Sequence, residues 1–159
     1  MKAASVVEIR KALKHCDEEE LSALVLRLAR FKKENKELLT YLMFESGHED
    51  SYVAGVKEEM DLLIGQINTN SQYYIRKSMR KVLKEIRKFA RYSGKKETEV
   101  ELLLFFCHRL IEFQPSIRQN RSLMKLYHRQ LFGLKQKIKK LHPDLQHDYE
   151  QELKALPSG

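Results

Sequence analysis

The sequence predicts an all-α protein, a compact antiparallel array of about seven to eight helices. Apolar residues recur every three or four positions along most of the chain, which is the period of a helix face, and no segment alternates as a strand does. Helix-capping residues separate these segments, while only six glycines and three prolines interrupt the 159 residues. Short connections between helices favour antiparallel neighbours.

The first helix is expected at residues 5–15. Asp17 then offers an N-cap for a second helix, with Glu20 at the spacing of a capping box. The apolar period resumes at residues 38–43, so this stretch is either one bent helix or, as we prefer, two helices with a tight break, ending before Ser46. The stripe of the second helix consists of Leu21, Leu24, Val25, Leu28 and Phe31.

Another helix is predicted at residues 52–67. Gly55 and Gly65 lie off its apolar stripe. Because glycine costs about 1 kcal/mol inside a helix, we expect each to permit close approach of another backbone. A turn at residues 68–71 follows.

Residues 71–92 form a helix with one apolar and one cationic face, which Ser93 and Gly94 terminate. Its apolar residues are Ile75, Met79, Val82, Leu83, Ile86, Phe89 and Ala90. Its cationic residues are Arg76, Lys77, Arg80, Lys81, Lys84, Arg87, Lys88 and Arg91. Glu85 alone interrupts the positive charges, and Tyr73 projects among them.

Residues 100–114 are apolar almost all round, which is typical of a helix surrounded by others, so we expect this helix at the centre of the domain. Thr98 and Glu101 have the spacing of a capping box at its start. Pro115 ends it.

The next helix is predicted at residues 117–141, with a capping box of Ser116 and Gln119. One side is apolar, and Phe132 projects from the middle of the basic side, where a purely solvated face would not place it. Pro143 suits the first turn of a last helix at 144–156. The binding residues expected on the basic side of helix 117–141 are Arg118, Arg121, Lys125 and Arg129.

The length and composition favour a single all-helical domain at residues 1–156 with a disordered tail at 157–159. No apolar run approaches the roughly eighteen residues that span a bilayer, and charges from Glu8 onward do not fit a signal peptide. We therefore expect a cytoplasmic protein that does not enter the membrane.

The net charge of +8 hides an asymmetry along the chain. Residues 71–143 hold 19 Lys and Arg against 5 Asp and Glu, a balance of +14. Residues 1–70 hold 10 against 13, and residues 144–159 hold 1 against 4, so both flanks are at −3. A basic block of this size favours anionic partners.

Catalytic and metal-binding patterns are weak. Cys107 and His108 are neighbours on a helix and point about 100° apart, so adjacency does not pair them, and Cys107 lies on the core stripe. Neither the cysteines nor the histidines have CxxC or HxxxH spacing. We expect structural thiols, no metal, no cofactor and no enzymatic activity.

Residues 9–44 contain the run LKHCDEEELSALVLRLARFKKENKELLTYLMF, a unit of helix, acidic cap, helix and helix. It resembles helical-hairpin, HEAT-like segments of uncharacterised bacterial proteins. The resemblance implies an αα-hairpin at the start of the chain and a scaffold that binds other macromolecules. It carries no catalytic residues across.

Two functional hypotheses follow from the basic helices. The first is a non-enzymatic interaction module whose basic surface binds an acidic protein partner or its own acidic half, with the oligomeric state open. The second is nucleic-acid binding through the same faces, with Tyr73 and Phe132 as stacking groups beside the phosphate-binding cations. A solvated basic face, partly neutralised by the acidic N-terminal half, stays open as the simplest alternative.

Overall fold

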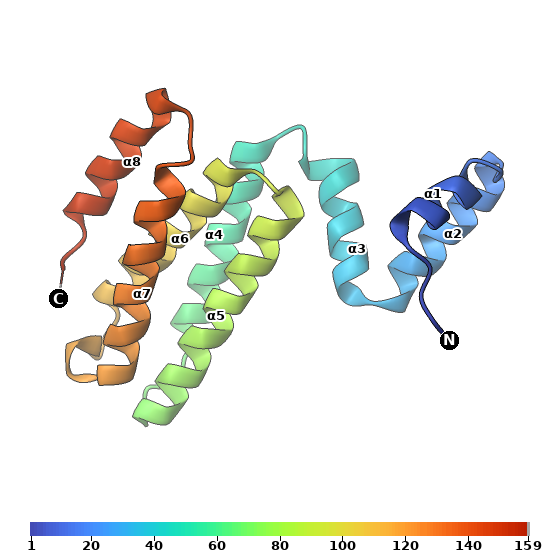
Figure 1. Cartoon of the computed structure of the whole chain (residues 1–159). Coiled ribbons are helices and arrows are strands. Elements are labelled where there is room, and N and C mark those ends of the chain that lie inside the picture. The colour runs from blue at the N-terminus through green and yellow to red at the C-terminus, as the bar shows by residue number, and fades with distance from the viewer. Residues whose placement is uncertain (159) are drawn as a thin grey trace. The chain divides into compact units, whose positions relative to one another are not determined.

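The computed structural model describes residues 1–158, and over these residues the chain is all-helical, without a strand (Figure 1). Gly159 lies outside the described residues. Eight α-helices are joined by short connections, with a π-helical turn, η1, and a 3₁₀ turn, η2. The elements are α1 (Val6–Leu13), α2 (Glu18–Phe31), α3 (Lys33–Thr40), η1 (Tyr41–Glu45), α4 (Glu49–Gly65), α5 (Gln72–Ser93), α6 (Lys96–Glu112), η2 (Ile117–Gln119), α7 (Arg121–Ile138) and α8 (Pro143–Ala155).

Contacts within the chain gather into two compact units, Met1–Phe44 and Glu45–Gly159, which we describe separately. The single domain expected over residues 1–156 stays a prediction. The expected tail at 157–159 reaches beyond the described residues, but its first two residues have partners. The Tyr127 hydroxyl donates to the Pro157 carbonyl at 2.5 Å, and Nε2 of His128 lies 2.9 Å from the Ser158 carbonyl oxygen.

The N-terminal unit begins with the two helix starts that its capping residues encode. At Asp17 the side chain accepts from the Glu20 amide at 2.8 Å, and the Glu20 carboxylate accepts from the Asp17 amide at 2.9 Å, which confirms the capping box. Ser5 forms the same motif before α1. Extended backbone at Lys32 (φ −139°, ψ 144°) separates α2 from α3, so two helices, not one bent helix, are present.

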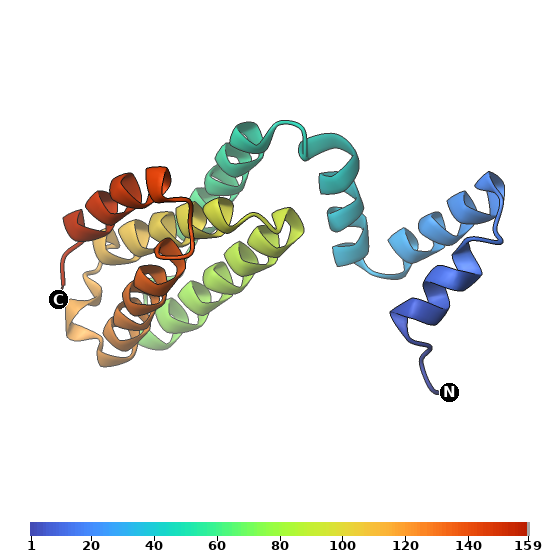
Figure 2. The same ribbon diagram turned by 45° about the horizontal axis from the view of Figure 1, so that its top comes forward.

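The C-terminal unit packs α4, α5, α7 and α8 around α6 (Figure 2). The prediction of a central helix is confirmed, because the run from Leu102 to Cys107 is buried without interruption. The apolar stripe of α5 faces this core. Its buried members are Ile75, Met79, Val82, Leu83, Ile86 and Ala90. Gly94 ends α5 with φ +69°, the left-handed conformation that glycine adopts without strain.

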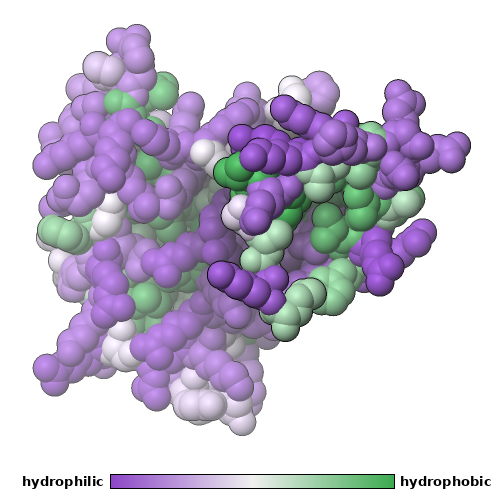
Figure 3. All heavy atoms as spheres, turned by 45° about the vertical axis from the view of Figure 1, so that its right-hand side comes forward, coloured by the Kyte–Doolittle hydropathy of each residue, from purple (hydrophilic) through white to green (hydrophobic). Residues whose placement is uncertain are grey.

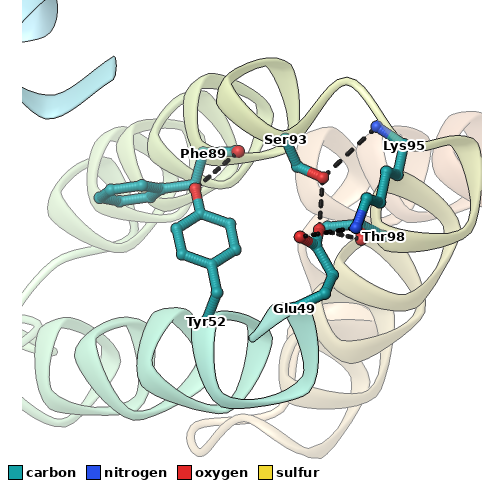
Figure 4. Close-up of polar contacts among 6 residues, drawn as sticks. All are labelled: Glu49, Tyr52, Phe89, Ser93, Lys95 and Thr98. Carbon is teal, nitrogen blue, oxygen red and sulfur yellow. Dashed lines mark hydrogen bonds and ion pairs between the residues drawn. The ribbon is translucent and has the colours of Figure 1, made fainter. Parts of the chain in front are cut away.

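A polar cluster ties the start of α4 to the connection between α5 and α6 (Figure 4). The Glu49 carboxylate accepts hydrogen bonds from the hydroxyls of Ser93 and Thr98, the latter at 2.6 Å, and lies 3.2 Å from Nζ of Lys95. Nearby, the Tyr52 hydroxyl donates to the Phe89 carbonyl at 2.8 Å. These bonds satisfy the buried Thr98 hydroxyl and fix the angle at which α5 turns into α6.

Two predicted helix starts are wrong. Thr98 lies inside α6, which begins at Lys96, and its hydroxyl bonds Glu49 instead of capping a helix. Ser116 caps only the short η2, and α7 starts later, at Arg121, where the Asn120 side chain accepts from the Leu123 amide at 3.1 Å. The Thr98 hydroxyl is taken by the Glu49 carboxylate, and the cap of α7 is supplied by Asn120 in place of Ser116.

The role expected for two glycines of α4 is also wrong. A β-carbon at Gly55 or Gly65 would meet no heavy atom within 4 Å, so neither position brings two backbones together. Gly55 is exposed, and Gly65 is the last residue of the helix. Among the described residues, no helix is both long and apolar enough to cross a membrane.

Candidate functional site

The two basic helices lie on either side of α6 and run in the same direction. Three side-chain hydrogen bonds join α5 to α7 or to its N-cap residue. Along these three bonds the residue numbers increase in the same direction in both helices, so the helices are parallel. The bonds join Gln72 to Asn120 at 2.7 Å, Arg80 to Ser122 at 2.9 Å and Arg87 to Gln130 at 3.1 Å. The apolar helix α6 packs against both α5 and α7, as expected of a central helix.

A hollow of about 810 Å³ lies between α5 and α7, with residues of α6 at its base, and we call it the basic groove. Its walls carry six cations, four of them from α5. Its floor and remaining walls come from all three helices. The cations are Arg80, Lys84, Arg87, Arg91, Arg129 and Lys137. The other lining residues are Leu83, Glu99, Leu103, Leu126, Gln130, Phe132 and Gly133.

The base of the basic groove is apolar, and its walls are cationic. Leu83 and Leu103 are each 3% exposed and close the floor, so they belong to the core as much as to the groove. Phe132 is 67% exposed and stands at the edge. A surface of this composition can cover an apolar side chain and hold an anionic group beside it, because both kinds of contact lie within one hollow.

Positive charge in the basic groove is largely uncompensated. Its one acid, Glu99, accepts from Nζ of Lys137 at 2.6 Å. Within residues 1–158, none of the other five groove cations has a carboxylate within 4 Å. Arg80 and Arg87 instead donate to the neutral oxygens of Ser122 and Gln130. Neutral partners orient a guanidinium without cancelling its charge, so the potential of the groove is positive.

A second hollow, of about 750 Å³, lies between the start of α5 and the start of α7, and we call it the polar hollow. It contains three cations and no acid. Every residue that lines it is polar or charged. They are Gln72, Arg76, Gln119, Asn120, Arg121, Ser122 and Lys125.

The predicted binding residues fall into three groups. Those in the basic groove are Arg80, Lys84, Arg87, Arg91, Arg129 and the stacking candidate Phe132. Those in the polar hollow are Arg76, Arg121 and Lys125. Those that line neither are Tyr73, Lys77, Lys81, Lys88 and Arg118. Of twelve predicted cations, eight therefore line the two hollows.

Lys88 does not lie on the exposed cationic face where the helical wheel placed it. Its side chain is 11% exposed, and its Nζ lies 2.6 Å from the Glu85 carboxylate and 4.9 Å from the centre of the Phe89 ring. A lysine at the boundary of the two faces can bury its stem and satisfy its charge within the same helix. Tyr73 is 58% exposed and meets Tyr74 edge-on, at 5.6 Å between ring centres.

Sequence reasoning missed Lys137 and the residues of the floor. Arg129, Gly133 and Lys137 follow one another at intervals of four, which places them on one face of α7, and this spacing was a readable signal. Leu103 and Leu126 gave no such signal, because a core leucine and a groove leucine have the same pattern.

Cys107 occupies the core of the C-terminal unit. Its side chain has no exposed surface, and burial raises the pKa of its thiol to about 12. A neutral thiol in apolar surroundings is a poor nucleophile. This environment fits the structural cysteine that the sequence indicated.

Comparison of the chain with protein-family models, with curated proteins and with solved structures finds no match. The functional assignment below therefore rests on the geometry of the two hollows.

Proposed function

We propose that the protein is a non-enzymatic interaction module whose basic groove binds an acidic segment of a partner protein, one that also carries apolar side chains. The observation that carries this proposal is that one hollow holds five cations without acidic partners beside the exposed ring of Phe132. A partner that offered charge alone would leave the exposed ring of Phe132 without a contact. An amphipathic helix with acidic flanks would use both.

The polar hollow supports a second candidate, a nucleic acid. Arg76, Arg121 and Lys125 converge there with amide and hydroxyl groups and without an apolar surface, a composition that suits phosphate oxygens. Phe132 would then stack a base in the adjacent basic groove. We rank this candidate second, because the polar hollow holds only three cations, whereas the basic groove holds six beside the exposed ring of Phe132.

A binding titration separates the two candidates. We expect a fluorescent peptide with Glu and Asp around Leu and Phe to bind the full chain. A peptide of the same charge without apolar residues should bind more weakly. Short single- and double-stranded oligonucleotides form the other arm. If about six phosphates were contacted, affinity for them would fall by about a thousandfold between about 50 and 200 mM salt. Oligonucleotide binding with that salt dependence, and no peptide binding, would reverse the ranking.

A matched pair of charge reversals on α5 tests the location. Lys84→Glu reverses a groove cation and should weaken peptide binding by roughly tenfold. Lys81→Glu makes the same change on the same helix, at an exposed position that lines neither hollow, and should stay within about twofold. Equal losses from both variants would mean that net charge, not the groove, attracts the peptide.

Phe132→Ala tests the apolar half of the proposal. Because this side chain is 67% exposed, its removal should leave the fold intact. We expect this variant to bind the peptide with Leu and Phe roughly tenfold more weakly, while its affinity for the peptide without apolar residues is unchanged. An unchanged affinity for both peptides would contradict an apolar contact at this edge of the groove.

A further inference from the structure

The N-terminal unit has an apolar face that its own helices do not cover. The stripe of α2 consists of Leu21, Leu24, Val25, Leu28 and Phe31, and these side chains are 36%, 44%, 42%, 60% and 75% exposed. In α1, Val6, Ile9 and Leu13 form a matching stripe and are also exposed. Figure 3 shows apolar side chains lying open at the surface of this unit.

No residue of α1, α2 or α3 is buried, and all three helices lie wholly within the described residues. Helices of 8 to 14 residues are marginal in water by themselves, and their stability normally comes from packing of the apolar face. A contiguous apolar face of this kind marks an interaction site. The remaining question is which surface covers it.

The charges beside the stripe identify a second copy of the same helix as the partner. Leu21, Leu24, Leu28 and Phe31 have the a and d spacing of two heptads, so the position that flanks this seam is held first by Glu20 and then, seven residues later, by Arg27. The two flanking charges are therefore opposite in sign along one edge of α2.

The order of these two charges along α2 determines the relative direction in which two copies of the helix pack. When two such helices pack antiparallel with Leu21 beside the partner's Leu24, Glu20 lies opposite the partner's Arg27 and the partner's Glu20 lies opposite Arg27. In this register Leu28 and Phe31 extend beyond the partner's stripe and are left for the partner's α1 to cover. When they pack parallel, Glu20 meets the apolar Val25, and Arg27 meets the end of the other helix at Lys32, so neither charge finds an opposite one. Attraction at both ends favours the antiparallel arrangement, which has the two-fold symmetry of an isologous dimer.

We propose that the chain forms a homodimer through α1 and α2, in which the two copies of α2 pack antiparallel and the two copies of α1 complete a helical bundle. This dimer does not use the basic groove and does not depend on the function proposed for it. It would place two basic grooves in one particle, so that a partner with two acidic segments binds with avidity.

Sedimentation velocity of the full chain over a concentration series tests the dimer. We expect a dimer for the wild-type chain and a monomer for Leu24→Asp, which puts a charge at the centre of the seam. Leu24 is 44% exposed within the chain, so this variant should keep its helix content, and circular dichroism checks that it does. A wild-type chain that stays monomeric throughout the series overturns the proposal, and so does a dimer that survives Leu24→Asp.

A charge exchange tests the antiparallel direction. Glu20→Arg sets an arginine opposite Arg27 in both of these pairs across the seam and should raise the dimer dissociation constant by roughly tenfold. Adding Arg27→Glu restores opposite charges in the reversed order and should recover most of that loss. Glu20 also closes the capping box at Asp17, but loss of a cap is not repaired by a change at Arg27.

Glu19→Arg is the matched control. It makes the same charge change in the same first turn of α2, so it has the same effect on the helix dipole, but it points away from the stripe. Its dissociation constant should stay near the wild-type value. Failure of the double variant to recover would overturn the antiparallel pairing. Lys84→Glu should leave the dimer intact, and its dissociation by this variant would instead place self-association in the basic groove.

Discussion

The apolar stripes of α2 and α5 have the same helical spacing but opposite surroundings. In α5, the buried members of the stripe are at most 5% exposed, because α4 and α6 cover them. In α2, every member is at least 36% exposed. The period of a stripe therefore predicts that a face must be covered, but it does not say whether the cover comes from the same unit of the chain. The C-terminal unit contains its own core, whereas α1, α2 and α3 of the N-terminal unit bury none of their residues.

The largest expected difference between the units concerns their cysteines. Cys107 is buried in α6 with a thiol pKa raised to about 12 from its ordinary 9.0, which lowers its thiolate fraction by roughly a thousandfold at neutral pH. Cys16, in the N-terminal unit, is partly exposed. We expect a disulfide-exchange reagent to titrate one thiol per native chain and the second only in denaturant. Rapid reaction of both thiols in the native chain would contradict a closed C-terminal core.

Two leucine-to-alanine variants, one in each unit, should differ in their effect on the free energy of unfolding. Leu110 of α6 has no exposed surface, and Leu110→Ala should lower the free energy of unfolding by about 2–5 kcal/mol. Leu28 of α2 is 60% exposed, and Leu28→Ala should change the unfolding of the C-terminal unit by less than about 0.5 kcal/mol. Urea titrations followed by circular dichroism measure both. Similar costs for the two variants would remove the distinction between the units.

The polar cluster at Glu49 should contribute less to the free energy of unfolding than the core does, but by a measurable amount. Glu49→Ala removes the acceptor of the buried Thr98 hydroxyl and should cost about 1–3 kcal/mol. Thr98→Val removes that hydroxyl instead, keeps the shape and leaves Glu49 bonded to Ser93 and Lys95, so about 0.5–1 kcal/mol is expected. If Thr98→Val were the more costly change, packing and not hydrogen bonding would hold this corner.

An effect of similar size is expected at Tyr127, which joins α7 to the C-terminal segment. Burial raises its pKa to about 12, so the fold favours the neutral phenol. The stability contributed by this shift is complete below the unfolded pKa of about 10 and is lost as the pH rises toward 12. Tyr127→Phe also loses the bond to the Pro157 carbonyl and should cost about 1 kcal/mol at neutral pH.

Wild-type unfolding should therefore become easier between about pH 10 and 12, and Tyr127→Phe should flatten part of that slope. Tyr149 and Cys107 also have raised pKa values and contribute in the same direction, so the comparison of variant and wild type isolates Tyr127. An identical slope in the variant would mean that Tyr127 is not the titrating group.

Local signals in the sequence were sufficient for most of the fold. The capping box at Asp17 and the first-turn proline Pro143 predict helix starts that the structure contains, because both signals depend on residues within one turn. The helix starts predicted at Thr98 and Ser116 were wrong because they too were inferred from neighbouring residues alone. Each has the right neighbour at the right spacing, and the bond each hydroxyl makes is set by the fold or by an adjacent amide.

The candidate site could be predicted only in part. The cations of α5 and α7 were visible in the sequence, as was the apolar helix between them. The groove depends on α5 and α7 running in the same direction across α6, which is a property of the packing, so Leu103 and Leu126 could not be recognised as its floor. Lys88 shows the limit of a helical wheel, since a side chain at a face boundary can turn either way.

Amide hydrogen exchange of the full chain at two protein concentrations tests the central claim most directly, because it reads both units in one sample. We expect the amides of α6 to be strongly protected at both concentrations. Those of α1 and α2 should exchange quickly in dilute solution and become protected as the concentration rises and the dimer forms. Strong protection of α2 that does not depend on concentration would show that its apolar stripe is already covered within a single chain, and would contradict the account.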